Sequence, residues 1–430
     1  MNNNKLNKSD LINILKNRGF VHQITEEKTL DNLLVKSKVS IYSGFDATAS
    51  SLHVGHLLPI MILRWAQKTK HKPIILLGGG TTKVGDPSGK DKSRKILDDK
   101  TIDENISSIK NIFSKFLNFS GTNNKATLVN NDEWLKEINY INFLRNVGKH
   151  FSINRMLTME SVKQRLERQQ PLSFLEFNYM VLQAYDFFHL NRKYKCLLQI
   201  GGSDQWGNIV MGIDLARRLS GVELYGMTCP LLTTASGQKM GKTEKGAIWL
   251  DSNKLSAFEY YQFWRNTEDA DVIRFLKLFT DLSIDEINEF SKLEGRDLNK
   301  AKITLAYECT KILHGQEASD KAKKTAMETY EARGTGTDLP TIKISQDNLD
   351  AGFSIVDVLT SPFEKSGANF LSLCKSKGEA RRLIKQGGAR VNNKKILDDQ
   401  YILTMNDFED SEAKISHGSK KHAKIIITGL

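Results

Sequence analysis

VSIYSGFDATASSLHVGHLLPIMILRW, residues 39–65, is the stretch of this chain that decides its fold. The apolar run Val39–Phe45 predicts a buried strand, and the pattern of Leu57–Trp65 predicts a helix that follows it. The string His53-Val54-Gly55-His56 therefore lies at a strand-to-helix turn. Such a turn presents free backbone N–H groups and the positive end of the helix dipole, which favour phosphate. Pro59 fits the first helical turn, where a missing N–H costs no hydrogen bond.

Short apolar runs that end in glycine alternate with helical patterns through the first half of the chain. Ile74–Leu77 precede Gly78-Gly79-Gly80, and Leu197–Ile200 precede Gly201-Gly202. This alternation predicts an α/β fold with a doubly wound, parallel, Rossmann-like sheet, whose ligands lie beyond the carboxyl ends of the strands. A mostly helical insertion at about 121–192 interrupts the alternation.

A second short string, Lys239-Met240-Gly241-Lys242-Thr243, places two lysines near glycines. Such a cationic loop would be able to close over phosphates held at the His53–His56 turn. Taken alone, neither string identifies a site. A chance occurrence explains the first, and a solvated loop the second, at least as well as a binding function does. Together, in this context, they indicate a nucleotide site.

Composition bounds the class of protein. The chain has 430 residues, enough for two or three domains, and a formal net charge of +12, which indicates a polyanionic partner or a solvated surface. The four cysteines contain no C-x-x-C pair, so neither a disulfide framework nor a zinc site is predicted, and a cytoplasmic location is expected. The N-terminus is unlike a signal or transit peptide, and no run approaches the ~18 apolar residues of a membrane span.

The last part of the chain has a different character. Residues from about 255 to 333 predict helices with charged faces, and 334–340 predicts a linker. Within 375–395, eight basic residues stand against one acidic residue. Arg381, Arg382 and Lys385 share one side of a short predicted helix, and Arg390 lies in the turn that leads into a strand. These four residues are predicted to contact RNA phosphates, with a solvated helix face as the alternative.

The segment Pro171–Leu190 predicts a buried helix, because its side chains are apolar almost all round. Ser173 and Glu176 form a capping-box signature at its start. Tyr179, Gln183 and Asp186, at spacings of four and three, make one polar stripe on this helix. A buried carboxylate needs a partner, which is either an internal hydrogen-bond network or a bound substrate.

The two strings resemble the HIGH and KMSKS signatures of class I aminoacyl-tRNA synthetases. The segments 42–48, 85–90 and 201–208 resemble the bacterial-type tyrosyl-tRNA synthetase family more closely, and the C-terminal segment resembles the S-four-type RNA-binding domain. The resemblance covers nearly the whole chain. Its departures are Val54 for isoleucine, Gly241 and Thr243 for two serines, and Ala47 where many relatives carry proline.

The resemblance implies roles for the site residues. In the tyrosine pocket, Tyr42 and Asp186 would hold the phenolic hydroxyl, three residues would hold the α-ammonium (Asp86, Tyr179, Gln183), and Gln205 would lie near the carboxylate. The residues that bind ATP would be Gly44, Asp46, Gly55, Lys90, Arg94, Gly202, Asp204 and Lys242. The residues that supply donors and positive charge to the reacting phosphates would be Thr48, His53, His56, Lys239 and Lys242.

The expected activity is that of a tyrosine–tRNA ligase, which forms tyrosyl-adenylate from tyrosine and Mg-ATP and then charges tRNA(Tyr). The resemblance also implies a cytoplasmic homodimer with its interface in the 121–192 insertion, no metal site, no zinc, no organic cofactor and no membrane partner. The expected domains are 1–235 (catalytic), 236–333 (KMSKS loop and helices), 334–352 (linker) and 353–430 (RNA-binding).

Two alternatives remain open from the sequence. One is the tryptophan-specific relative, against which the phenol-binding pair Tyr42 and Asp186 counts. The other is an RNA-binding or splicing-assistance protein on a retired synthetase scaffold, against which the intact signature strings count.

Overall fold

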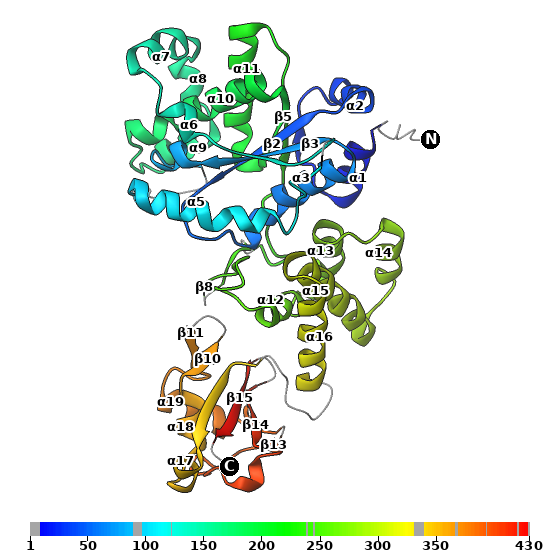
Figure 1. Cartoon of the computed structure of the whole chain (residues 1–430), viewed down its shortest axis with the longest axis vertical. Helices are drawn as coiled ribbons and strands as arrows, with labels where there is room; N and C mark the ends of the chain where they lie inside the picture. Colours follow the sequence, from blue (N-terminus) through cyan, green and yellow to red (C-terminus); the bar gives the residue numbers. More distant parts are fainter. Residues whose placement is uncertain are drawn as a thin grey trace. The chain divides into compact units, whose positions relative to one another are not determined.

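The computed structural model describes residues 9–88, 97–121, 123–237, 240–243, 246–330, 339–365, 369–392, 394–418 and 421–428. The chain forms two compact units (Figure 1). The first unit consists of Met1–Leu250 and Glu268–Leu293, and the second of Asp251–Thr267 and Glu294–Leu430. Within the described ranges, none of the helices has the length and apolar character needed to cross a membrane.

The first unit is built on a six-stranded sheet in the order β1-β6-β5-β2-β3-β4. The strands are β1 (Gln23–Ile24), β2 (Ser40–Asp46), β3 (Lys72–Gly78), β4 (Thr127–Asn130), β5 (Cys196–Gly202) and β6 (Tyr225–Cys229). All neighbouring pairs are parallel except β1 with β6. The chain proceeds outward from β2 to β4 on one side and from β5 to β6 on the other, so the strand order reverses between β2 and β5. The predicted doubly wound α/β fold is confirmed.

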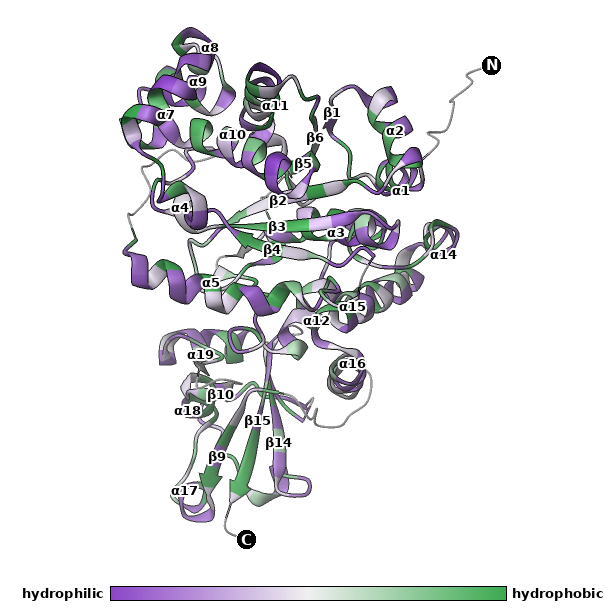
Figure 2. Cartoon of the chain, turned by 45° about the horizontal axis from the view of Figure 1, so that its top comes forward, coloured by the Kyte–Doolittle hydropathy of each residue, from purple (hydrophilic) through white to green (hydrophobic). Residues whose placement is uncertain are grey.

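Helices cover both faces of this sheet (Figure 1). The helices of the first unit are α1 (Asp10–Arg18), α2 (Glu27–Lys36), α3 (Leu57–Lys68), α4 (Gly79–Thr82), α5 (Asp99–Phe113), α6 (Asp132–Leu135), α7 (Tyr140–Asn146), α8 (Ile153–Leu157), α9 (Glu160–Glu167), α10 (Phe174–Tyr194), α11 (Trp206–Ser220), α13 (Val272–Phe279) and α14 (Ile284–Phe290). Helix α3 packs against β2 and β3, whereas α10 and α11 pack against each other and against β5. The central strands are strongly hydrophobic (Figure 2), as expected for a sheet buried on both faces.

Helix α10 begins as its sequence predicts. The Ser173 hydroxyl accepts a hydrogen bond from the Glu176 N–H at 3.1 Å, and the Glu176 carboxylate accepts from the Ser173 N–H at 3.2 Å. Glu176 also forms a buried ion pair with Arg165 of α9 at 2.8 Å. A buried charge needs such a partner, so this pair fixes the start of the helix that carries the polar stripe.

The second unit contains a group of packed helices and a seven-stranded sheet. The packed helices are α12 (Ala257–Arg265), α15 (Leu298–His314) and α16 (Gln316–Tyr330). The sheet has the order β11-β10-β9-β15-β14-β12-β13 and is accompanied by α17 (Gln346–Asp350), α18 (Ile355–Thr360) and α19 (Lys377–Lys385). Its strands are β9 (Thr341–Ser345), β10 (Phe363–Lys365), β11 (Asn369–Leu371), β12 (Ala389–Val391), β13 (Lys394–Lys395), β14 (Glu412–His417) and β15 (Lys421–Thr428). Within the stretch predicted as a linker, residues 341–350 form β9 and α17.

A candidate active site where the strand order reverses

A cavity of about 310 Å³ lies at the carboxyl ends of β2 and β5. Open α/β sheets bind ligands at this position, because the loops that follow the two strands diverge to opposite faces. The predicted site residues that line the cavity are Tyr42, Gly44, Asp46, Thr48, Gly55, His56, Asp86, Tyr179, Gln183, Asp186, Gly202, Asp204 and Gln205. The fold therefore brings residues predicted to bind tyrosine and residues predicted to bind ATP into one cavity.

Asp186 is fully buried, with an exposed fraction of 0%. Its carboxylate accepts hydrogen bonds from Asn131 Nδ2 and Trp134 Nε1, both at 2.8 Å. Burial raises the pKa of Asp186 to about 7, although these two hydrogen bonds favour the ionised form. Asn131 and Trp134 thus orient the carboxylate and partly offset its loss of hydration.

Two buried polar atoms in the cavity lining have no hydrogen-bond partner among the described residues. They are the hydroxyl of Tyr42 and Oε1 of Gln199, which lie on paired positions of β2 and β5. Burial, and then the charge of Asp186, raise the pKa of Tyr42 well above its usual value. An unpaired buried polar group is costly, so this part of the cavity fits a ligand that carries its own polar group.

A second cluster of carboxylates surrounds Tyr179. Its hydroxyl donates to Asp46 Oδ2 at 3.0 Å, and the Thr81 hydroxyl donates to Asp46 Oδ1 at 2.8 Å. Burial raises the pKa of Tyr179, and the charges of Asp46 and Asp86 raise it further. The negative potential that shifts this phenol favours a cationic group of a ligand.

Amide side chains continue this cluster. Gln205 Nε2 donates to Asp86 Oδ2 at 2.8 Å, and Asn208 Nδ2 donates to Gln183 Oε1 at 2.9 Å and to Gln205 Oε1 at 3.2 Å. The chain of contacts fixes the orientation of both glutamine amides. Each glutamine is therefore held in one orientation before any ligand arrives.

The two histidines form a short 3₁₀ helix, η1 (Val54–His56), with His53 as its N-cap. His53 Nδ1 accepts from the Gly55 N–H at 3.1 Å, and His56 Nδ1 accepts from the His53 N–H at 3.2 Å. Because His53 Nδ1 is an acceptor, the proton of a neutral His53 ring is on Nε2. His56 Nδ1 lies 3.2 Å from both the N–H and the carbonyl of His53, so its role as acceptor or donor depends on the tautomer of the ring. Burial, and then the neighbouring His53, lower the pKa of His56 to about 3.

This pKa separates His56 from the cationic members of the predicted phosphate site. His56 is neutral at pH 7, because a buried cation beside a second imidazole is unfavourable. His56 lines the cavity, whereas His53 is not among the described lining residues. Glycine is required at the turn between them, since a Cβ on Gly55 would lie 2.7 Å from Cε1 of His53.

The described part of the second string lies against the histidine turn. The Ile248 N–H donates to the Gly241 carbonyl at 3.2 Å, and the Val54 N–H donates to the Ile248 carbonyl at 3.0 Å. An isolated β-bridge also pairs His53 with Trp249. The backbone thus brings the two signature strings side by side. Lys90, Arg94, Lys239 and the side chain of Lys242 lie outside the described residues.

The predicted RNA-contacting residues lie in the second unit. Arg381, Arg382 and Lys385 are exposed on α19, and Arg390 is partly exposed on β12. Ser376 caps α19 by accepting from the Glu379 N–H at 3.2 Å. Arg381 approaches Asp399 at 3.7 Å, a loose ion pair that leaves the guanidinium accessible.

Five residues that line the cavity or bond to its lining were not predicted from the sequence: Thr81, Asn131, Trp134, Gln199 and Asn208. Asn131 directly follows β4, a position that places a polar side chain at the ligand-binding edge of a parallel sheet. That signal was available in the sequence. The partnership of Trp134 with Asp186 was not, because it joins positions 52 residues apart.

Among the described residues, one group of three side chains has the chemistry of a metal site. Ligand atoms of Cys374, Glu379 and His417 lie within 4.8 Å of one another. However, His417 Nδ1 lies 2.8 Å from the Leu373 carbonyl, and Glu379 Oε2 accepts from the Lys375 N–H at 2.7 Å. These contacts explain the arrangement without a metal ion.

Comparison with known proteins places this site in a family. The family model described as "tRNA synthetases class I (W and Y)" matches residues 35–331, and the S4 domain model matches residues 369–408. The chain therefore belongs to the class I tRNA synthetases of this group and carries an S4 domain.

Individual relatives narrow the comparison. A tyrosine–tRNA ligase of Rhodopseudomonas palustris is 56% identical over 96% of this chain and 98% of its own length. The tyrosine–tRNA ligase of Zymomonas mobilis is 53% identical over 97% of this chain and 98% of its own. Among solved structures, a C-terminally truncated mitochondrial tyrosyl-tRNA synthetase of Aspergillus nidulans is 34% identical, covers 74% of this chain and 92% of its own, and has a TM-score of 0.67.

Proposed function

We infer that this chain is a tyrosine–tRNA ligase, which activates L-tyrosine with ATP and transfers the tyrosyl group to tRNA. The observation that carries the inference is that Tyr42 and Asp186 are both buried in the lining of the cavity. The family to which the chain belongs makes an amino acid the expected occupant of this cavity. A phenolic hydroxyl would donate to the Asp186 carboxylate and accept from the unpaired hydroxyl of Tyr42. The names of relatives that match nearly the full length support the same activity.

We propose that tyrosine lies across the cavity between the two clusters of polar residues. Its α-ammonium would bind near Asp86, Tyr179 and Gln183, where the potential is negative. Its carboxylate would lie near Gln205, whose amide is already held by Asp86 and Asn208. This orientation points the carboxylate toward the ATP half of the site.

ATP would occupy the part of the cavity lined by Gly44, Asp46, Gly55, Gly202 and Asp204. The tyrosine carboxylate would attack the α-phosphate in line and displace pyrophosphate, after which the terminal ribose hydroxyl of the tRNA would take the tyrosyl group. Positioning and electrostatic stabilisation supply the catalysis, and no protein nucleophile is required. We propose Mg-ATP as the nucleotide substrate, with no zinc and no organic cofactor in the reaction.

The proposed phosphate-binding groups divide into two kinds. Thr48, His53 and His56 would donate hydrogen bonds, and His56 would do so as a neutral ring because of its low pKa. The cationic groups would be Lys90, Arg94, Lys239 and Lys242, which would stabilise the charge that develops as pyrophosphate leaves.

ATP–pyrophosphate exchange measured across all twenty amino acids tests this function. Only tyrosine should support rapid exchange. Exchange with tryptophan in place of tyrosine would identify the tryptophan-specific relative, and exchange with no amino acid would identify an RNA-binding protein on a retired scaffold.

The pKa of Asp186 predicts a pH dependence of tyrosine binding. The ionised carboxylate is the better acceptor for the phenolic hydroxyl, and Asp186 with a pKa of about 7 loses its charge as the pH falls. We expect the dissociation constant of tyrosine to rise roughly tenfold between pH 8 and pH 6, since one pKa unit corresponds to a tenfold change. Equilibrium titration of the free enzyme with tyrosine at each pH measures this dissociation constant.

The control for this experiment is Asp186→Asn, which cannot titrate. Its tyrosine affinity should be lower and independent of pH over the same range. A wild-type affinity that stays constant from pH 6 to pH 8 would mean that Asp186 is already ionised in the free enzyme.

We propose that the chain divides into domains at 1–235, 236–333 and 353–430, and that residues 341–350 of the predicted linker belong to the last of these, because β9 is an interior strand of its sheet.

We propose that the C-terminal segment binds tRNA through Arg381, Arg382, Lys385 and Arg390. Reversing the charge of Arg381 and Arg382 with glutamate should weaken tRNA binding and lower its salt slope by about 0.9 for each phosphate that the protein no longer neutralises. Tyrosyl-adenylate formation should remain unchanged. Lys343→Glu, a charge reversal of an exposed lysine on β9, serves as the control. An unchanged salt slope would show that the basic face of α19 is only solvated.

We propose that the chain acts as a cytoplasmic homodimer whose interface lies in the 121–192 insertion. Large exposed apolar side chains gather there, as expected of an interaction surface: Tyr140, Ile141, Leu144, Ile153, Leu157, Leu166, Phe174 and Leu175. Its four cysteines are free thiols, which supports a reducing compartment.

Charge placed on this apolar surface tests the dimer. Ile141 and Phe174 are 68% and 70% exposed, so aspartate at either position should be tolerated by the monomer. We expect each variant to raise the dimer dissociation constant at least about 30-fold, or about 2 kcal/mol, in sedimentation equilibrium. Val35→Asp, at a 54% exposed position on α2, should leave it unchanged. Equal behaviour of all three variants would place the interface elsewhere.

A further inference from the structure

Helix α13 contacts the chain that leads into the second signature string. Asp271, only 2% exposed, accepts a hydrogen bond from the Ala235 N–H at 2.7 Å and one from Arg274 Nη2 at 2.7 Å. Arg274 also donates to the Thr233 carbonyl. The start of α13 therefore holds two backbone groups that lie four to six residues before Lys239.

This stretch and the second string are also tied to each other. The Met240 N–H donates to the Leu232 carbonyl at 2.9 Å. This hydrogen bond joins the chain before the string to the chain within it. Leu232 lines the cavity, and the chain after Met240 is hydrogen-bonded to the histidine turn through Gly241 and Ile248. A shift of Thr233–Ala235 would therefore move the string as well. It would change the distance between the string and the phosphates of bound ATP.

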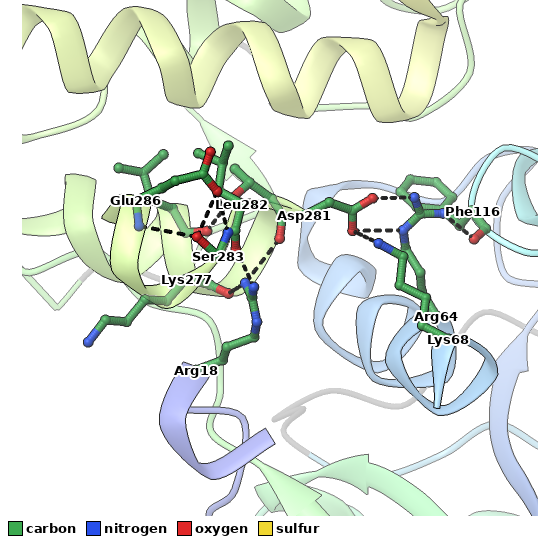
Figure 3. Close-up of polar contacts among 11 residues, drawn as sticks. Arg18, Arg64, Lys68, Phe116, Lys277, Asp281, Leu282, Ser283 and Glu286 are labelled. Atoms are coloured by element: carbon green, nitrogen blue, oxygen red, sulfur yellow. Dashed lines mark hydrogen bonds and ion pairs between the residues drawn. The ribbon is translucent and has the colours of Figure 1, made fainter. Parts of the chain in front are cut away.

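The other end of α13 is fixed by a charged network (Figure 3). Arg18 of α1 donates to the carbonyls of Lys277, at 2.8 Å, and Thr280, at 3.1 Å, and also to that of Leu282. The bonds to Lys277 and Thr280 satisfy carbonyls at the end of α13, and the bond to Leu282 holds the chain that follows the helix.

Asp281 completes the network in Figure 3 by joining this end of α13 to α3. Its carboxylate accepts from Arg64 Nε at 3.2 Å and from Lys68 Nζ at 2.7 Å, and Arg64 donates as well to the Phe116 carbonyl at 2.6 Å. The charges of Arg64 and Lys68 hold the pKa of Asp281 below its usual value, although burial opposes the shift. Helix α3 begins at the histidine turn, so α13 is anchored to the element that carries the first signature.

We propose that Asp271 and Arg274 are positioning residues for adenylate formation, which set the place of the described backbone of the second string, residues 240–243, relative to the His53–His56 turn. Helix α13 acts as the strut between the two, with Asp281 as its attachment to α3. The physical reason is that electrostatic stabilisation of a transition state depends on where the charges are held. The proposal rests on the role of Lys242 given above.

Pre-steady-state formation of tyrosyl-adenylate, at saturating tyrosine and ATP, tests the proposal. Asp271→Ala should lower the rate constant by roughly 10- to 100-fold, the loss expected when reacting groups are misplaced by about 1 Å, and leave tyrosine affinity unchanged. Asp271→Asn keeps an acceptor for the Ala235 N–H and should recover most of the rate. Asp269→Ala removes an exposed carboxylate from the same 3₁₀ helix, η4 (Asp269–Asp271), and should have no effect.

A double-mutant cycle with Lys242→Ala separates positioning from general damage. If Asp271 acts through the string, its replacement should cost little in the Lys242→Ala background, so the two effects are not additive. Additive effects, or a loss of tyrosine affinity equal to the loss of rate, would overturn the inference.

Two further outcomes keep the test decisive. If Lys242→Ala alone leaves the rate unchanged, the proposed role of Lys242 is wrong, and the comparison of Asp271→Ala with Asp269→Ala still decides whether α13 affects the rate. If Asp271→Ala does not fold, Arg274→Gln takes its place, because this half-exposed side chain tolerates substitution. It should slow adenylate formation with tyrosine affinity unchanged, and a normal rate would refute the strut.

Discussion

Replacement of Lys242 by alanine is expected to slow tyrosyl-adenylate formation by about 10²–10³-fold, or about 3–4 kcal/mol, the usual cost of losing one donor to developing charge. The lysine would act on the phosphates as pyrophosphate leaves, and its string lies beside the histidine turn through the contacts of Gly241 and Ile248. Single-turnover kinetics measure the rate constant. Tyrosine affinity should barely change, because the tyrosine pocket lies among residues of β2, β5 and α10.

The matched control is Lys254→Ala, which removes a lysine from outside the string. Its rate should equal that of the wild type. A loss of tyrosine affinity in Lys242→Ala as large as the loss of rate would assign the lysine to ground-state binding and remove it from the transition state.

Asp186→Ala is expected to reduce tyrosine activation by roughly 10- to 150-fold, since a hydrogen bond to a charged group contributes about 1.5–3 kcal/mol. The variant also leaves Asn131 Nδ2 and Trp134 Nε1 without their acceptor. Phenylalanine has no hydroxyl to donate, so whatever activation it shows should be retained. ATP–pyrophosphate exchange with both amino acids measures the two effects in the same protein.

Phenylalanine is therefore the internal control of this experiment. Equal losses for both amino acids would mean that Asp186 only supports the fold. A loss confined to tyrosine would locate discrimination at the hydroxyl and explain why the chain places a fully buried carboxylate on α10.

Local pattern predicted the elements that position the site. The strands β3 and β5 were recognisable as apolar runs followed by glycine, and β2 as the apolar run Val39–Phe45 before the histidine turn, because buried parallel strands are apolar on both faces. Helix α10 was recognisable from its capping box and its single polar stripe. The place of the cavity followed from the same pattern, because parallel strands bring their carboxyl ends to one edge of the sheet.

The protonation of the site could not be predicted in the same way. His53 and His56 were singled out by their motif, but the motif does not give the low pKa of His56. Its pKa depends on burial and on the distance to a second imidazole, and both are properties of the packed turn. Likewise, the pKa of Asp186 depends on the balance between desolvation and two hydrogen bonds.

The sequence by itself thus determined the fold class, the polar stripe of α10 and the two signature strings, because local periodicity and short motifs identify them. The resemblance to a family supplied Tyr42 of β2, and Gln199 of β5 became visible only in the structure. The tertiary structure alone decided which groups support them. Asn131 and Trp134 reach Asp186 across more than 50 residues, Asp271 reaches Ala235 across 36, and Asp281 reaches Arg64 across 217. Such partnerships follow from how the strands and helices are packed, and no local pattern records them, because each side chain viewed alone is an ordinary polar residue.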